Sequence, residues 1–98
     1  MNVSINSVHF KADNKLEQFI EKKVGKLSGY FEGVIASEIT LKIDKAETKD
    51  NKVTEIKLQI PGYELYAKKQ SSTFEQSTDT AVSAIKKQLE KHKGKFKK

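Results

Sequence analysis

Residues 55–69 read EIKLQIPGYELYAKK, and this stretch decides the fold. Isoleucine and leucine at positions 56, 58 and 60 alternate with charged or polar residues, the pattern of a strand with one buried face. Pro61-Gly62 then suits the centre of a tight turn, because proline presets φ at the first central residue and glycine accepts a positive φ at the second. The chain therefore returns as another strand over residues 63–69.

Upstream of this hairpin the alternation continues. Residues 35–44 form the clearest strand, with isoleucine or leucine at positions 35, 39, 41 and 43 on one face. Residues 2–8 predict a short first strand with Val3 and Ile5 on one face. Residues 45–52, KAETKDNK, are polar and turn-forming. Strands that alternate in this way have one solvated face, so something must cover the other.

Two amphipathic helices supply that cover. The first starts after Asp13 or Asn14 as cap and ends at Gly29 and Gly33. The second begins near Ser72 or Thr73, each with a glutamate or glutamine three residues later. Apolar stripes at helical spacing comprise Leu16, Phe19, Ile20, Val24, Leu27 and Phe31 in the first helix, and Phe74, Thr78, Ala81, Ile85, Leu89, His92 and Phe96 in the second.

The resulting order is β-α-β-β-β-α. It predicts an α+β fold, a two-layer sandwich in which a four-stranded sheet carries two helices on one face. With 98 residues and no interdomain linker, we expect one domain over residues 1–98.

The positive charge is concentrated at one end of the chain. All 19 basic residues are lysine, and residues 1–85 contain as many acidic residues as lysines. Residues 86–98 hold seven lysines against Glu90 and so carry the whole net charge of +6. This distribution favours a polyanionic partner. A solvated face, with lysines favoured at the negative end of a helix dipole, is the alternative that composition leaves open.

Helical phase groups these lysines. Lys15, Lys22 and Lys26 fall on one flank of the first helix, whereas Lys23 turns toward the apolar side and extends along it. In the second helix one flank holds Lys86, Lys93 and Lys97, and another holds Lys87, Lys91 and Lys98. If the helices lie side by side, basic flanks meet at their seam. Lysine without arginine favours contact with a phosphate backbone over base reading.

No pattern indicates an enzyme or a cofactor. Cysteine is absent, and neither His9 nor His92 has a nucleophile or a metal-ligand spacing beside it. His92 falls on the apolar stripe, where packing is the better interpretation. The first ten residues contain no long apolar run, so we expect a cytoplasmic protein without a membrane span.

Tyr63 and Tyr66 lie on the same predicted strand and face opposite sides of the sheet. An exposed strand tyrosine either packs on the sheet or stacks on a base.

Four segments carry a family resemblance that extends over nearly the whole chain: VSINSVHF, KVGKLSGYF, ITLKIDKAET and KKQLEKHKGKFKK. They are similar to the short ribosome hibernation-promoting factors, also called ribosome-associated translation inhibitors. The closing segment, with Gln-Leu-x-Lys-His-Lys, is the most specific. The resemblance implies the same sandwich, similar to double-stranded RNA-binding domains.

It also implies a function. Such factors bind the small ribosomal subunit in the mRNA and tRNA channel and inhibit translation in stationary phase or stress. By resemblance the rRNA-binding residues are Lys23, Lys26, Lys87, Lys91, Lys93 and Lys95. Helical phase and charge, without the resemblance, add Lys22 and Lys86 to this set of expected rRNA-binding residues. We expect partners in the small subunit, its rRNA and the 70S ribosome, with no small-molecule substrate, no metal and no membrane, and a monomer off the ribosome.

Two departures accompany the resemblance. Related factors often carry Asp-Met-Tyr at the start of the second helix, where this chain has Ser72-Thr73-Phe74-Glu75. Phe74 is either a core anchor or a replacement for that tyrosine. Long members also have a C-terminal dimerisation domain, which we do not expect here.

Two other functions remain as alternatives to ribosome hibernation. One is a general double-stranded RNA-binding module, and the other is a membrane-surface or protein-interaction domain. Phe96 is the single bulky apolar candidate on the basic helix, which argues against a membrane-surface or protein-interaction domain.

Overall fold

The computed structural model contains the expected hairpin, built from β3 (Lys52–Ile60) and β4 (Tyr63–Ser71). Ile60 pairs with Tyr63 across the turn, and Gly62 has a φ of 71°, a left-handed conformation that glycine adopts without strain. The structure describes residues 2–8, 10–30, 33–44 and 50–96, and for Tyr30 and residues 93–96 it describes the backbone alone.

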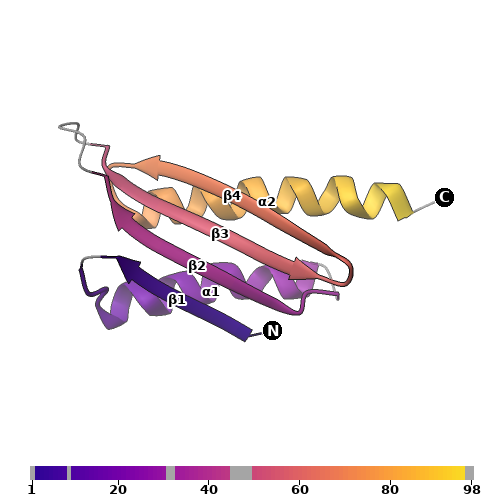
Figure 1. Ribbon diagram of the computed structural model, residues 1–98, viewed down its shortest axis with the longest axis horizontal. Helices are drawn as coiled ribbons and strands as arrows, with labels where there is room; N and C mark the ends of the chain where they lie inside the picture. The colour runs from indigo at the N-terminus through magenta and orange to yellow at the C-terminus, as the bar shows by residue number, and fades with distance from the viewer. Residues whose placement is uncertain (1, 9, 31–32, 45–49, 97–98) are drawn as a thin grey trace.

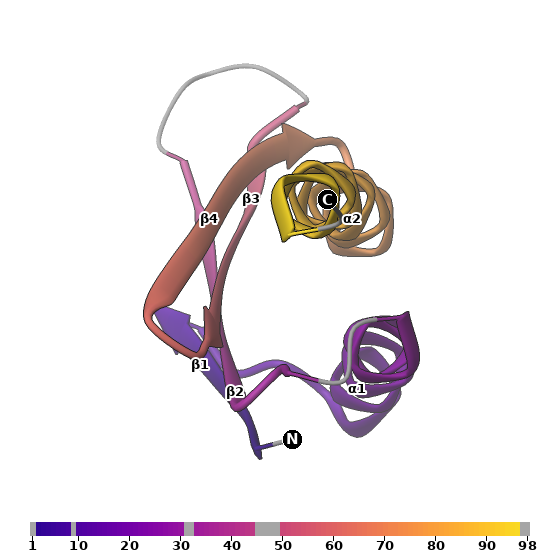
Figure 2. The ribbon, with the colours of Figure 1, turned by 90° about the vertical axis from the view of Figure 1, so that its right-hand side faces the viewer.

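The other elements complete the predicted order. β2 (Ala36–Ile43) is antiparallel to β3, and β1 (Asn2–Val8) is parallel to β2, giving a mixed sheet with the order β1-β2-β3-β4 (Figure 1). α1 (Asn14–Tyr30) connects the two parallel strands, and α2 (Phe74–Phe96) follows β4. Both helices cover the same face of the sheet, which confirms the α+β two-layer sandwich (Figure 2).

A single apolar layer fills the space between sheet and helices. Ile85 and Leu89 of α2 are fully buried, as are Ile20 and Val24 of α1. They pack on the inward residues of the strands, because successive strand residues point to opposite faces. The buried strand residues of this layer are Ile39, Leu41, Ile56, Leu58, Ile60, Leu65 and Ala67.

Three hydroxyl groups connect β3 to the first two turns of α2 inside this layer. Thr54 Oγ1 lies 2.6 Å from Ser77 Oγ and 3.3 Å from Thr78 Oγ1. All three side chains are buried, and each finds a hydrogen-bond partner, so their burial avoids the cost of an unsatisfied polar group.

The helix starts resolve the alternatives left by the sequence. The backbone N–H of Leu16 donates to Asp13 Oδ1 at 2.8 Å, so Asp13 caps α1. The N–H of Gln76 donates to Thr73 Oγ1 at 3.1 Å, so Thr73 caps α2. α1 ends at Tyr30, between the two glycines that were expected to end it.

One part of the strand prediction is wrong. Ile35 and Ile43 were expected on the buried face with the other apolar residues of this strand, but their exposed fractions are 50% and 45%. Ile35 precedes β2 and Ile43 is its last residue, so both lie at the ends of the strand, whereas Ile39 and Leu41 in its middle are fully buried. Alternation predicts the direction of a side chain correctly, but not whether a helix covers that end of the sheet.

The face of the sheet opposite the helices is polar and holds one charged network. Glu55 accepts a hydrogen bond from the Tyr66 hydroxyl at 2.8 Å, and its other oxygen lies 2.5 Å from Lys42 Nζ. The hydrogen bond from Lys42 lowers the pKa of Glu55 below its ordinary value, against the opposing effect of burial. Burial, followed by the bond to Glu55, raises the pKa of Tyr66.

The buried stripe of α2 generates a stability prediction. Ile85→Ala removes a fully buried side chain and leaves a cavity, so the free energy of unfolding should fall by about 2–5 kcal/mol in urea denaturation. Ser83→Ala on the exposed side of the same helix is the control, with an expected change within about 0.5 kcal/mol. Equal effects of the two substitutions would contradict the placement of α2.

The Glu55 network generates a pH prediction. Because the pKa of Glu55 is depressed in the folded state, its ionised form adds stability above the unfolded value near 4.5. That contribution is lost as the pH falls through the lower folded value. The stability difference between the wild type and Glu55→Gln should therefore shrink in urea denaturation as the pH falls from neutral to below about 4. A difference that is constant with pH would show that the network does not favour the carboxylate.

Candidate nucleic-acid interface

An ion pair links the two helices. Lys23 Nζ of α1 lies 3.2 Å from Asp79 Oδ1 of α2. Both helices run antiparallel to β1 and β4, so they run in the same direction (Figure 1). From Lys23 the first helix has seven residues left to Tyr30, whereas from Asp79 the second has seventeen left to Phe96. α2 therefore extends past α1 by ten residues, or about 15 Å.

The charges of α2 are sorted along its length. Glu75 and Asp79 lie in its first two turns, and its second half holds the exposed lysines Lys86, Lys87 and Lys91 with Glu90 as its single acidic residue. This order suits the helix dipole, which favours anions at the N-terminus and cations at the C-terminus. Lys86, Lys87 and Lys91 therefore lie in the C-terminal half of α2, whose end projects beyond the β3–β4 turn (Figure 1).

The lysines of α1 differ from one another. Lys22 and Lys26 are exposed. Lys23 is half-buried, with its ammonium 5.6 Å from the centre of the Phe19 ring and paired with Asp79. The prediction that Lys23 extends along the apolar surface is confirmed. Asp79 was missed by the sequence reasoning, because nothing in the local pattern links residues on two different helices.

The lysines of α2 spread over its outer side. Asp79 faces α1, and Lys86 follows it by two turns, so Lys86 lies on the α1 side. Gln88 Nε2 donates to the carbonyl oxygen of Tyr66 at 2.8 Å, so its flank faces β4, and Lys91 lines a cleft there. Lys87 precedes Lys91 by one turn on that flank. The side chains of the predicted residues Lys93 and Lys95, like those of Lys97 and Lys98, lie outside the described part of the chain.

The seam between the helices is not uniformly basic. Lys26 lies about one turn beyond Lys23, and Lys86 lies on the side of α2 toward α1. The other end of the seam holds Glu75 and Asp79 together with Lys23. The basic surface is therefore the C-terminal end of the helix layer, not the whole seam.

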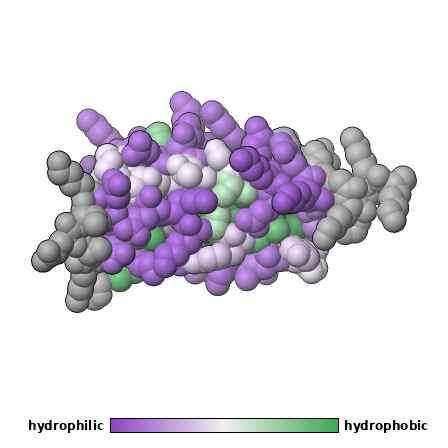
Figure 3. Space-filling model, turned by 90° about the horizontal axis from the view of Figure 1, so that it is seen from above, coloured by the Kyte–Doolittle hydropathy of each residue, from purple (hydrophilic) through white to green (hydrophobic). Residues whose placement is uncertain are grey.

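The opposite face of the sheet carries no charge excess among its described residues. Its outward strand positions hold three lysines and three glutamates, namely Glu38, Lys42, Glu55, Lys57, Glu64 and Lys68. Viewed over α2 and β4, the surface is mainly hydrophilic with small apolar areas (Figure 3). The described side chains of α1 and α2, by comparison, comprise seven lysines and five acidic residues, so the charge excess lies on the helix layer.

Two aromatic side chains can now be placed. Phe74 is 8% exposed and stacks on Phe10 with ring centres 5.0 Å apart, so it is a core anchor. His92 is half-buried and packs against Tyr63 with ring centres 5.2 Å apart, in line with a packing role. His9 lies outside the described residues.

Other kinds of site find no support in the described residues. Within them, no group of three or more histidine or acidic side chains is arranged to hold a metal ion. In the same part of the chain, no helix is long and apolar enough to cross a membrane.

Comparison with solved structures supports the fold. A ribosomal subunit interface protein from Coxiella burnetii superposes with a TM-score of 0.85 over 96% of this chain and 99% of that protein, at 19% identity. The N-terminal domain of Protein Y from Thermus thermophilus gives a TM-score of 0.80 over 94% of this chain and 99% of that domain, at 18% identity.

Sequence comparison identifies the family. The ribosome hibernation promoting factor of Pseudomonas putida is 26% identical over 97% of this chain and 89% of that protein. The factor of Escherichia coli K12 is 25% identical over 99% of this chain and 98% of its own length. The factor of Bacillus subtilis is 24% identical over 97% of this chain, but over only 50% of its own length. The family profile described as "Sigma 54 modulation protein / S30EA ribosomal protein" matches residues 3–97, and the chain therefore belongs to this family of non-enzymatic ribosome hibernation factors.

Proposed function

We propose that this protein binds the small ribosomal subunit in the channel used by mRNA and tRNA, and so inhibits translation in stationary phase or stress. The observation that carries the proposal is the asymmetry of the two faces. Exposed lysines gather at the end of the helix layer, whereas the open sheet face has equal numbers of lysines and glutamates at its described positions.

The chemistry of these lysines fits rRNA as the partner. An ammonium group is a point charge that suits phosphate oxygens and lacks the planar fork that reads a base edge. Lys86, Lys87 and Lys91 cover the outer side of α2, and Lys22 and Lys26 add exposed charge on α1. Neutralised phosphates release counterions, so binding should weaken steeply as salt rises.

The family indicates which RNA this surface meets. The relatives are named for ribosome hibernation, and the Coxiella protein for the ribosomal subunit interface. The inhibition we propose is steric, since a domain lodged in the channel excludes mRNA and tRNA without any reaction. We propose that the protein acts in the cytoplasm, where ribosomes are, and as a monomer when off the ribosome.

Charge reversal on α2 tests this surface. Lys87→Glu with Lys91→Glu should weaken co-sedimentation with small subunits at least tenfold at moderate salt, and should lower the slope of log affinity against log salt by about 2. The matched control is Lys57→Glu with Lys68→Glu, which makes the same charge change on the open face. If the control pair weakens binding as much as the α2 pair, the proposed surface is wrong.

Competition tests the proposed location. Added mRNA and tRNA should displace the wild-type protein from small subunits, because they occupy the same channel. A blunt RNA duplex at equal phosphate concentration should displace it poorly. Equal displacement by the duplex would favour the general double-stranded RNA-binding alternative. If the protein stays bound to small subunits that already hold mRNA and tRNA, the proposed location in the channel is wrong.

A further inference from the structure

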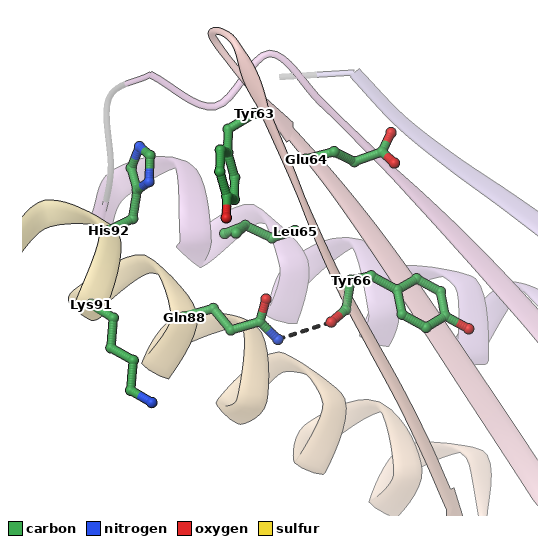
Figure 4. Close-up of a pocket in the computed structure, with 7 residues that line it drawn as sticks. All are labelled: Tyr63, Glu64, Leu65, Tyr66, Gln88, Lys91 and His92. Atoms are coloured by element: carbon green, nitrogen blue, oxygen red, sulfur yellow. Dashed lines mark hydrogen bonds between the residues drawn. The ribbon is translucent and has the colours of Figure 1, made fainter. Parts of the chain in front are cut away.

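A cleft of about 400 Å³ lies between β4 and the second half of α2, beside the proposed basic surface. Its size falls in the range of pockets that hold small ligands, roughly 300–1,000 Å³. Its lining comes from four consecutive residues of β4 and three residues of α2, namely Tyr63, Glu64, Leu65, Tyr66, Gln88, Lys91 and His92 (Figure 4). Leu65 is buried and gives the cleft an apolar floor.

Tyr63 gives the cleft an exposed aromatic wall. Its side chain is 53% exposed although it contacts His92, where the two rings meet at an interplanar angle of 43°. It points toward α2, whereas the side chains of Glu64 and Tyr66 point away from the cleft (Figure 4). About half of this large aromatic side chain therefore remains available to a ligand. Nucleobases stack on exposed aromatic surfaces of this kind.

The main chain of β4 adds hydrogen-bonding groups at the rim. β4 is an edge strand, and the carbonyl of Tyr66 points outward to accept a hydrogen bond from Gln88. In an antiparallel pair, alternate residues direct both their N–H and C=O groups away from the partner strand. Glu64 is two residues before Tyr66, so its N–H and C=O also point outward at this rim. A donor and an acceptor side by side can meet the polar edge of a base.

Lys91 and Glu64 are the two charged residues among those that line the cleft. Lys91 lines it, and Lys87 is exposed one turn earlier on the same flank of α2. The carboxylate of Glu64 is directed to the other face of the sheet (Figure 4). The cleft therefore suits a nucleotide. Its aromatic wall, apolar floor and outward main-chain groups suit the base, and the lysines at its rim suit the phosphate.

We infer that the β4–α2 cleft binds one unpaired RNA nucleotide, with its base stacked on Tyr63 and its phosphate near Lys91. This inference rests on the proposed function in taking RNA as the ligand of the helix side. It extends that function, because the lysines alone contact the backbone whereas the cleft requires an unstacked base. The preferred target is then single-stranded or bulged RNA next to a phosphate-rich surface.

The test compares two tyrosines on one strand. Tyr63→Leu and Tyr66→Leu make the same change, but the Tyr66 side chain lies on the open face, where it bonds Glu55, and only the main chain of Tyr66 borders the cleft. The affinity for a short oligoadenylate is measured by amide chemical-shift titration of the full chain. It should fall by roughly 5- to 100-fold in Tyr63→Leu. It should stay within about twofold of the wild type in Tyr66→Leu and in Tyr63→Phe, which keeps an aromatic ring.

An abasic ribose-phosphate strand of the same length separates stacking from charge. It should bind the wild type about as weakly as oligoadenylate binds Tyr63→Leu. Lys91→Gln should weaken both strands by a similar factor, because it acts on phosphate. Equal affinity of the wild type for the two strands, or equal loss in Tyr63→Leu and Tyr66→Leu, would overturn the cleft assignment. Thermal melts of each variant verify that it is folded.

Ribosome co-sedimentation of the same variants keeps the two proposals apart. If the wild type does not bind small subunits but binds oligoadenylate through Tyr63, the proposed function fails and the cleft assignment stands. If the wild type binds small subunits while Tyr63→Leu leaves oligoadenylate affinity unchanged, the cleft assignment fails and the proposed function stands.

Discussion

The structure depends on the burial of one stripe of α2 against the β3–β4 hairpin. Ala81, Ile85 and Leu89 are fully buried, and they fix the rotation of the helix about its axis. The hydroxyl cluster of Thr54, Ser77 and Thr78 anchors the start of the same helix to β3. Because the stripe of Ala81, Ile85 and Leu89 faces the sheet, helical geometry directs Lys86, Lys87 and Lys91 toward the outside of the molecule. The packing of the core therefore determines the surface on which the proposed function rests.

The same constraint explains why the molecule has one charged end. The two helices run in the same direction, and their lysine-rich second halves lie toward the same end of the sheet. The dipole of α2 favours cations at that end, whereas the last turn of α1 holds no basic residue. The solvated-surface interpretation and the binding interpretation are thus compatible. The neutrality of the open face is the observation that favours binding, since a merely solvated protein has no need to separate its charges.

Most of the fold could be predicted from the sequence, because alternation and helical spacing report which side of each element is buried. The turn at Pro61-Gly62 and the stripe through Ile85 followed directly from those patterns. The extent of burial at Ile35 and Ile43 did not, because it depends on how far the helices reach over the sheet. The site was predictable only in part. Phase placed the lysines, but the Lys23–Asp79 pair and the contact of Gln88 with β4 join elements distant in sequence, and no local pattern encodes them.

The central claim is that rRNA of the small subunit meets the helix layer and not the open face of the sheet. Site-specific photocrosslinking tests it most directly, with a photoreactive amino acid in place of Lys87 in one sample and of Lys57 in another. The account predicts crosslinks to small-subunit rRNA from position 87 and few or none from position 57. Crosslinks mainly from position 57, or equally from both positions, would contradict it.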